Sequence, residues 1–179
     1  MTLPLRLAKP SDVPALRQLI ERAVRELSRG YYTESQIENA LRHVFGPDTQ
    51  LVADGTYYAI ESGVGELVAS GGWGRRRTLY GGDQTKGTED PLLNPATDPA
   101  RVRAFFVHPD WARRGLARRL FERCRDDAVA AGFRGMELMA TLPGVPLYQA
   151  LGFAVIEESA FEFPDGERLP LIRMGRALP

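Results

Sequence analysis

The spacing of apolar residues and a capping signal together predict three helices along the chain. Between positions 11 and 28 apolar residues recur every three or four positions, as on the buried face of an amphipathic helix. The same spacing over 115–131 predicts a second helix of this kind. Thr33 followed by Gln36 matches a capping box, which predicts the start of a further helix over 34–44.

Shorter apolar or alternating runs predict a set of strands. The segment 79–100 is rich in Gly, Asp, Thr and Pro, and it predicts a long loop that is either mobile or functional. The resulting order β-α-α-β-β-β-α-β-α-β-β predicts a single α/β domain over residues 1–179, built around a mixed sheet. The expected strands are 3–8, 56–61, 66–73, 101–107, 135–140, 153–157 and 168–174, with a short helix over 146–151.

The net charge and the small number of cysteines and histidines exclude several classes of binding partner and site. The chain has 23 basic and 23 acidic residues, so its formal net charge is zero, which argues against a protein that coats nucleic acid or an anionic membrane. The single cysteine, Cys124, excludes a framework of internal disulfides and a zinc site made of several thiolates. His43 and His108 lack metal-ligand spacing, so no metal is expected.

The chain start and the hydropathy pattern predict a location. Pro4 and Arg6 interrupt the apolar residues at the start, which does not fit a signal peptide. No apolar run reaches the roughly 20 residues that span a bilayer. A soluble cytoplasmic protein is therefore expected, without a membrane partner and with a homodimer as an open alternative.

The start of the helix over 115–131 has the chemistry of an anion site. Its dipole already makes this end positive, so basic residues here are unfavourable unless an anion is bound. Gly115 and Ala117 leave room for a close approach to the free backbone N–H groups. A solvated basic face is the alternative, but the strand–loop–helix context favours the anion site. The arginines in these turns are Arg113, Arg114, Arg118 and Arg119.

Two common phosphate motifs do not fit this segment. A P-loop requires G-x-x-x-x-G-K-[ST], and neither Lys9 nor Lys86 has that context. A dinucleotide-binding fingerprint requires G-x-G-x-x-G after the first strand, whereas the glycines at 71, 72 and 74 have neither that spacing nor that position. The remaining possibility is that this segment binds the phosphate of a nucleotide-type ligand through a different motif.

Two motifs resemble those of the GCN5-related N-acetyltransferase (GNAT) superfamily. Residues 112–117 (ARRGLA) are similar to its Arg/Gln-x-x-Gly-x-Gly/Ala phosphate motif, with Ala112 as the departure. Residues 148–153 (YQALGF) are similar to its Tyr-x-x-x-Gly-Phe segment. The element order matches over nearly the whole chain. The resemblance implies the acyl-CoA N-acyltransferase (GNAT) fold, a central mixed, mostly antiparallel sheet flanked by helices.

The resemblance also implies an activity and the residues that carry it. The expected enzyme moves an acetyl group from acetyl-CoA to an amine, which we expect to be a small molecule. Tyr148 occupies the general-acid position, and a phenol with a pKa of about 10 can protonate a thiolate whose thiol has a pKa of about 8.5. The main chain of Phe105, Phe106 and Val107 would bind the pantetheine arm. The residues expected at the phosphates are Arg113, Arg114, Gly115, Leu116, Ala117 and Arg118.

Several alternatives stay open on the sequence alone. The general base is either water or Glu137. The amine could belong to a protein, and the chain could be a CoA-binding sensor without turnover. Arg75, Arg76 and Arg77 could be solvated or could recruit an acidic group. Aromatic residues that could approach an apolar or a cationic acceptor are Tyr31, Tyr32, Trp73 and Tyr80.

Overall fold

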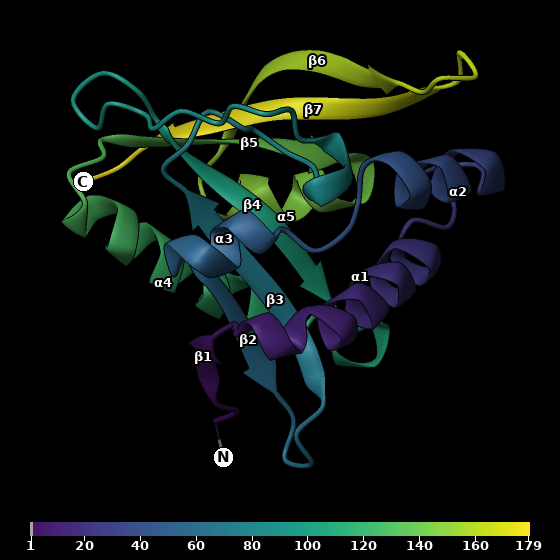
Figure 1. Ribbon diagram of the computed structural model, residues 1–179, viewed down its shortest axis with the longest axis horizontal. Helices are drawn as coiled ribbons and strands as arrows, with labels where there is room; N and C mark the ends of the chain where they lie inside the picture. The colour runs from purple at the N-terminus through teal and green to yellow at the C-terminus, as the bar shows by residue number, and fades with distance from the viewer. Residues whose placement is uncertain (1) are drawn as a thin grey trace.

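The computed structural model describes residues 2–179 and shows one seven-stranded sheet with helices on both faces (Figure 1). The strand order is β1-β2-β3-β4-β5-β7-β6, and all neighbours are antiparallel except β4 and β5. The predicted mixed, mostly antiparallel sheet is confirmed. The strands are β1 (Leu5–Leu7), β2 (Tyr57–Glu61), β3 (Leu67–Gly74), β4 (Ala100–Val107), β5 (Gly135–Thr141), β6 (Ala154–Glu162) and β7 (Arg168–Ala177).

The helices divide between the two faces of the sheet. One apolar cluster joins the sheet to α4 and α5, and two others join it to α1, α2 and α3. The two-sided burial of the sheet explains why β2 has four consecutive apolar residues before Glu61: Tyr57 and Ala59 pack on the α1 side, and Tyr58 and Ile60 on the α4 side. The helices are α1 (Val13–Leu27), α2 (Glu34–His43), α3 (Thr49–Asp54), α4 (Leu116–Ala130) and α5 (Val145–Ala150).

Local signals account for the predicted helices. The apolar stripe of α1 is buried, as its periodicity predicts. At α2, the Thr33 side chain accepts a hydrogen bond from the Gln36 N–H, and the Gln36 side chain accepts one from the Thr33 N–H. The predicted capping box is confirmed.

Helix α3 is missing from the prediction. It has six residues, too few for a periodic pattern to reveal it. Its signals are local: the Asp48 carboxylate accepts a hydrogen bond from the Leu51 N–H at 3.1 Å, and Gly55 ends the helix with a φ of 71°.

Strand β6 and the segment 79–100 also differ from expectation. β6 continues to Glu162 instead of ending at 157, because it pairs with β7 along its length at the edge of the sheet. The segment 79–100 contains a 3-10 turn at Asp83–Thr85 and contacts the sheet through ion pairs described below. Over residues 2–179, none of the helices has the length and apolar character needed to cross a membrane.

Candidate active site

The sheet opens into a cleft between β4 and β5. Among residues 2–179 these parallel strands pair only at Ala100 with Met136 and at Arg101 with Glu137, and beyond these positions they diverge (Figure 1). A cavity of about 680 Å³ lies there, with walls from α1, β4, the start of α4, β5, α5 and residues 79–82. The divergence leaves main-chain groups at the end of β4 without a partner on β5, so a ligand can pair with them.

A bulge in β4 shapes one wall of this cleft. Ala104 has a φ of 57°, in the left-handed region that residues with side chains seldom adopt. Two β4 residues, Ala104 and Phe105, lie opposite Gly71 of β3. A Cβ on Gly71 would be 2.6 Å from the Phe105 ring, so a glycine is required there. The Ser70 hydroxyl donates a hydrogen bond to the Ala104 carbonyl at 3.4 Å. The sequence patterns did not reveal this bulge.

The bulge also separates the three β4 residues predicted to bind the pantetheine arm. Phe105, Phe106 and Val107 all line the cleft. Phe105 and Val107 pack against the apolar cluster that contains α4 and α5, and Phe106 packs against the cluster that contains α1 and α2. The end of β4 therefore lies between the two halves of the cleft.

The start of α4 is an open helix N-terminus at the cleft. Arg113 and Gly115 have φ values of 65° and 80°, and Gly115 is an N-cap without a side chain that could satisfy the first N–H groups. Backbone N–H groups in the first turn of a helix have no intrahelical partner. The lining residues that belong to this turn are Gly115, Leu116, Ala117 and Arg118. The arrangement suits an anion, as expected.

The side chains of the four arginines in this segment point to different places. Arg113 and Arg118 line the cleft and are exposed. The Arg114 guanidinium instead lies 4.8 Å from the centre of the Trp111 ring, in a cation–π contact. Arg119 donates a hydrogen bond to the Leu3 carbonyl at 2.9 Å. Only two of the four guanidinium groups are thus placed at the cleft, and the role of Arg114 stays a prediction.

Tyr148 lies in the opposite wall, on α5. Its side chain is 9% exposed, and its ring centre is 6.5 Å from that of Phe105 and 5.9 Å from that of Phe153. Burial, and to a smaller extent the nearby Cys124 thiol, raises the pKa of Tyr148 above that of a free phenol. Tyr148 therefore keeps its proton at neutral and moderately alkaline pH.

Glu137 and the two histidines lie outside the cleft. The Glu137 carboxylate accepts hydrogen bonds from Arg173, the shorter at 2.6 Å, and is 3.6 Å from Arg101. His108 is buried, and its Nδ1 accepts a hydrogen bond from the Asp110 N–H at 3.1 Å, as expected of a turn residue. His43 lies on α2, 6.0 Å from the ring of Phe163.

The aromatic candidates for the acceptor pocket divide in two. Tyr31 is 53% exposed and lines the cleft, and Tyr80 lines it as well. Tyr32 is instead buried, where its hydroxyl donates to the Pro170 carbonyl at 2.6 Å and accepts from the Leu142 N–H at 3.0 Å. Trp73 is 2% exposed and packs on Phe133 in the core. Tyr32 and Trp73 therefore support the fold and do not reach the cleft.

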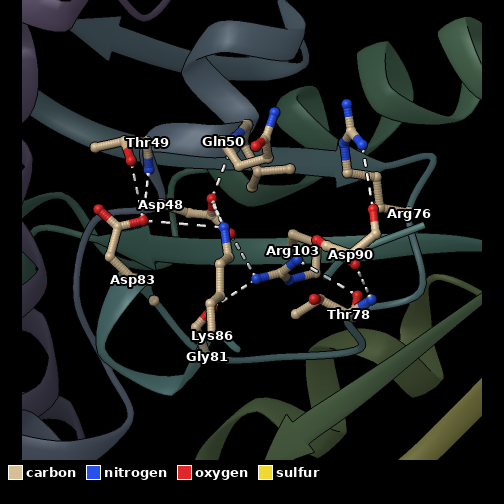
Figure 2. Close-up of polar contacts among 12 residues, drawn as sticks. Asp48, Thr49, Gln50, Arg76, Thr78, Gly81, Asp83, Lys86, Asp90 and Arg103 are labelled. Atoms are coloured by element: carbon tan, nitrogen blue, oxygen red, sulfur yellow. Dashed lines mark hydrogen bonds and ion pairs between the residues drawn. The ribbon is translucent and has the colours of Figure 1, made fainter. Parts of the chain in front are cut away.

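Arg103 is a cleft residue that the sequence patterns did not single out. It is 3% exposed and donates hydrogen bonds to the Asp48 carboxylate at 2.7 Å and to the Gly81 carbonyl at 2.5 Å (Figure 2). Lys86 forms a second ion pair with Asp48. Desolvation by burial lowers the pKa of Arg103, with the charge of Asp48 opposing this effect. The three charges attach the loop that contains Tyr80 and Gly81 to β4.

Arg75 and Arg76 have local partners. Arg76 binds the Asp54 carboxylate at 2.8 and 3.0 Å, which raises the pKa of Arg76. The Arg75 guanidinium lies 5.2 Å from the centre of the Trp73 ring. These contacts assign Arg75 and Arg76 to the structure of the sheet end. Within residues 2–179, no group of three or more His, Cys, Asp or Glu side chains is arranged to hold a metal ion.

Comparison with known proteins defines the class. The family described as acetyltransferase (GNAT) domain matches residues 94–171, from the segment before β4 into β7. This range includes the β4 bulge, the start of α4 and Tyr148. A search of curated proteins finds no match.

Solved structures agree with this assignment. A protein from Rhodopseudomonas palustris, described as a GCN5-related N-acetyltransferase (aminotransferase, class-II), is 19% identical, with a TM-score of 0.72 over 99% of this chain and 97% of that chain. The putative acetyltransferase yncA from Salmonella typhimurium, solved with acetyl-CoA, is 18% identical, with a TM-score of 0.64 over 100% and 95% of the two chains. The PaiA N-acetyltransferase from Thermoplasma acidophilum, solved with coenzyme A, is 11% identical, with a TM-score of 0.66 over 99% of each. At these identities the likeness concerns the fold.

The fold and the family match together define an acyltransferase of the acyl-CoA N-acyltransferase class. Residues 94–171 match the GCN5-related N-acetyltransferase domain, in agreement with the two motifs, and the chain shares its fold with solved members of that superfamily. This match supports an enzyme that transfers acyl groups.

Proposed function

We propose that this chain is an N-acetyltransferase that moves an acetyl group from acetyl-CoA directly to a small-molecule amine, and that residues 1–179 form one domain. The observation that carries the proposal is the cleft between β4 and β5. An open helix N-terminus lies at this cleft, and a buried, protonated phenol lies in its wall. A cytoplasmic location, also part of the proposal, fits the free and buried thiol of Cys124.

The residues around the start of α4 would bind the cofactor's phosphates. The N–H groups of the first turn would donate hydrogen bonds to them, and the exposed Arg113 and Arg118 would add positive charge. Arg114 would act indirectly, by holding the Trp111 ring that lines the cleft. The fit rests on donors without intrahelical partners and on small side chains at Gly115 and Ala117.

The main chain at the end of β4 would orient the acyl group. Phe105, Phe106 and Val107 lie where β4 no longer pairs with β5, so their N–H and C=O groups can pair with an extended amide-containing arm. An N–H group there can also donate to the oxygen on which negative charge develops during acyl transfer.

Tyr148 would protonate the departing thiolate. Its raised pKa keeps the proton on the phenol before the reaction, which is the state that a general acid requires. The ion pairs of Glu137 favour water over this residue as the acceptor of the amine proton.

Thermal unfolding with acetyl-CoA tests the cofactor part of the proposal. Acetyl-CoA at a concentration of about 100 Kd should stabilise the native state by about 2.7 kcal/mol. The variant Ala117→Glu should abolish this shift, because its carboxylate would lie among the N–H groups of α4. Ala130→Glu, at the exposed far end of the same helix, is the matched control and should keep the shift. An unchanged shift in Ala117→Glu would place the phosphates elsewhere.

Thiol release from acetyl-CoA tests turnover. With a panel of small amines and of peptides, we expect release that depends on a small amine, together with formation of its acetamide. Release only with peptides would assign the acceptor to proteins. Binding of acetyl-CoA without release for any amine would favour the alternative of a CoA-binding sensor, which the departure at Ala112 also suits.

A further inference from the structure

The half of the cleft under α1 and α2 is where an amine would meet the acyl group, given the proposed position of the donor along α4. Phe106 faces this half, and Phe105 and Val107 face the other. Four side chains give this half an aromatic lining: Tyr31, Phe45, Tyr80 and Phe106. Aromatic walls favour an apolar acceptor.

The charged side chains that line the cleft are all arginines. The charged side chains among the described lining residues are Arg103, Arg113 and Arg118, and the last two belong to the start of α4. Arg103 is 3% exposed, and its Nε is buried without a hydrogen-bond partner in the described chain. Asp48 is its counter-ion at 2.7 Å, so this carboxylate is already occupied and is not available to an incoming cation.

The carboxylates around this half are held by other groups (Figure 2). Asp48 is almost fully buried, and Asp83 and Asp90 lie in the loop behind Tyr80 and Gly81. Their partners are Arg103 and Lys86 for Asp48, Thr49 and Lys86 for Asp83, and the Thr78 N–H for Asp90, while Glu137 on β5 binds Arg173. Tyr31 and Tyr80 add neutral phenols, and burial raises the pKa of Tyr80, so it keeps its proton.

These surroundings favour a neutral amine over an ammonium group. A cation that enters an apolar site beside a buried guanidinium loses hydration without gaining a counter-ion. The neutral amine is also the nucleophile. At pH 7, roughly one in ten α-amines is neutral, because their pKa is about 8, but only about one in 2,500 alkylamines, with a pKa near 10.4.

We infer that the acceptor is a small, apolar primary amine of low basicity, such as an α-amine beside a neutral carbonyl group, and not an alkylamine or a polyamine. The inference rests on the proposed acetyl transfer. In this reaction the amine nitrogen forms a bond to the acetyl carbon, the carbon–sulfur bond breaks, and the thiolate takes a proton. The nitrogen releases its proton to water.

A matched pair of amines tests the inference. Phenylalanine amide and phenethylamine share the aromatic group and differ by the carboxamide that lowers the basicity of the amine. Thiol release should give a kcat/KM about 250-fold higher for the amide at pH 7 and about tenfold higher at pH 9.5, following the neutral fractions of the two amines. Equal values at pH 7, or a higher value for phenethylamine, would overturn the inference.

A pair of variants tests whether the charge at the cleft sets this preference. Tyr31 is half-exposed, so its replacement leaves the core intact. Tyr31→Glu should reduce the amide preference at pH 7 about fivefold, because a carboxylate at the cleft favours an ammonium group. Tyr31→Gln introduces a side chain of the same size as Glu but without its charge. It should leave the ratio of kcat/KM between the two amines as it is in the wild type. The same ratio in both variants would contradict the electrostatic argument.

The assay separates this inference from the proposed function. Thiol release with phenethylamine but not with the amide overturns the inference and leaves acetyl transfer standing. If neither amine is acetylated but acetyl-CoA still raises the melting temperature, the proposed acceptor class is wrong while cofactor binding stands. If acetyl-CoA does not bind, the proposed function itself falls.

Discussion

Tyr148 brings a protonated phenol into the wall of the cleft. Its ring packs against Phe105 and Phe153, so the hydroxyl group can be removed without removing these apolar contacts. The burial that raises its pKa also disfavours release of the proton to water before the reaction. Removing only the hydroxyl group therefore separates the contribution of Tyr148 to the reaction from its contribution to packing.

We predict that Tyr148→Phe lowers kcat about 100-fold, the lower end of what a general acid contributes, and changes acetyl-CoA affinity less than about twofold. Thiol-release assays measure kcat, and calorimetric titration measures the affinity for acetyl-CoA. In the wild type, ionisation of this phenol should not reduce the rate below about pH 10. Tyr58→Phe removes a phenol that binds Asp127 outside the cleft and serves as the control. Equal kcat values for Tyr148→Phe and the wild type would remove Tyr148 from the mechanism.

Tyr31 and Tyr32 show how neighbouring residues acquire different roles. They are adjacent and identical in type, yet Tyr31 lines the cleft and Tyr32 is buried. The two hydrogen bonds of Tyr32 connect the segment between α1 and α2 with the Leu142 turn that precedes α5 and with β7. Tyr32 is therefore a positioning residue for the wall that holds Tyr148.

The loop after β3 is a wall of the acceptor half, and it is attached through charge. Gly81 and Gly82 line the cleft. Lys86 and Arg103 both bind the Asp48 carboxylate (Figure 2). Each cation offsets part of the cost of burying the Asp48 carboxylate. The expectation of a loop that is either mobile or functional is thereby refined, because ion pairs hold the part that meets the cleft.

We predict that Lys86→Met lowers the free energy of unfolding by about 1–3 kcal/mol, less than complete loss of a buried pair because Arg103 remains. It should also raise the KM for the amine several-fold while leaving acetyl-CoA affinity unchanged. Urea denaturation and steady-state kinetics measure these effects. Lys9→Met, at the other lysine of the chain, is exposed and provides the control. Matching results for the two variants would show that Lys86 does not hold the loop.

The middle of the sheet is covered on both faces, and this burial encloses several tyrosines. Burial raises the pKa of Tyr32 and of Tyr58 to about 12, and it raises the pKa of Tyr57 and Tyr148 further. In the unfolded chain these phenols ionise near pH 10. Above that pH the unfolded state binds fewer protons than the native state, so stability falls as pH rises.

We predict that the free energy of unfolding is insensitive to these groups below about pH 9. Between pH 10 and 12 it should fall by roughly 1 kcal/mol per pH unit for each buried tyrosine. Urea denaturation at a series of pH values, with tyrosinate absorbance followed in parallel, measures this loss. Tyr32→Phe should make the decline less steep. Native-state ionisation of all six tyrosines at pH 10 would contradict the prediction.

The sequence by itself determined the elements whose cause is local. Apolar periodicity specifies α1 and α4, the Thr33–Gln36 pair specifies the start of α2, and residues 112–117 and 148–153 carry the family motifs. Each of these signals lies within a few residues, and backbone propensity and helix capping act at that range. The fold class followed from their order.

Tertiary structure alone decided how the cleft is lined. It placed Arg113 and Arg118 at the cleft, directed Arg114 and Arg119 to Trp111 and to Leu3, and buried Tyr32 but not Tyr31. It also joined Arg103 to Asp48, 55 residues earlier in the chain. Such contacts depend on packing between distant segments, and the energy of a buried charge depends on surroundings that only the folded chain provides.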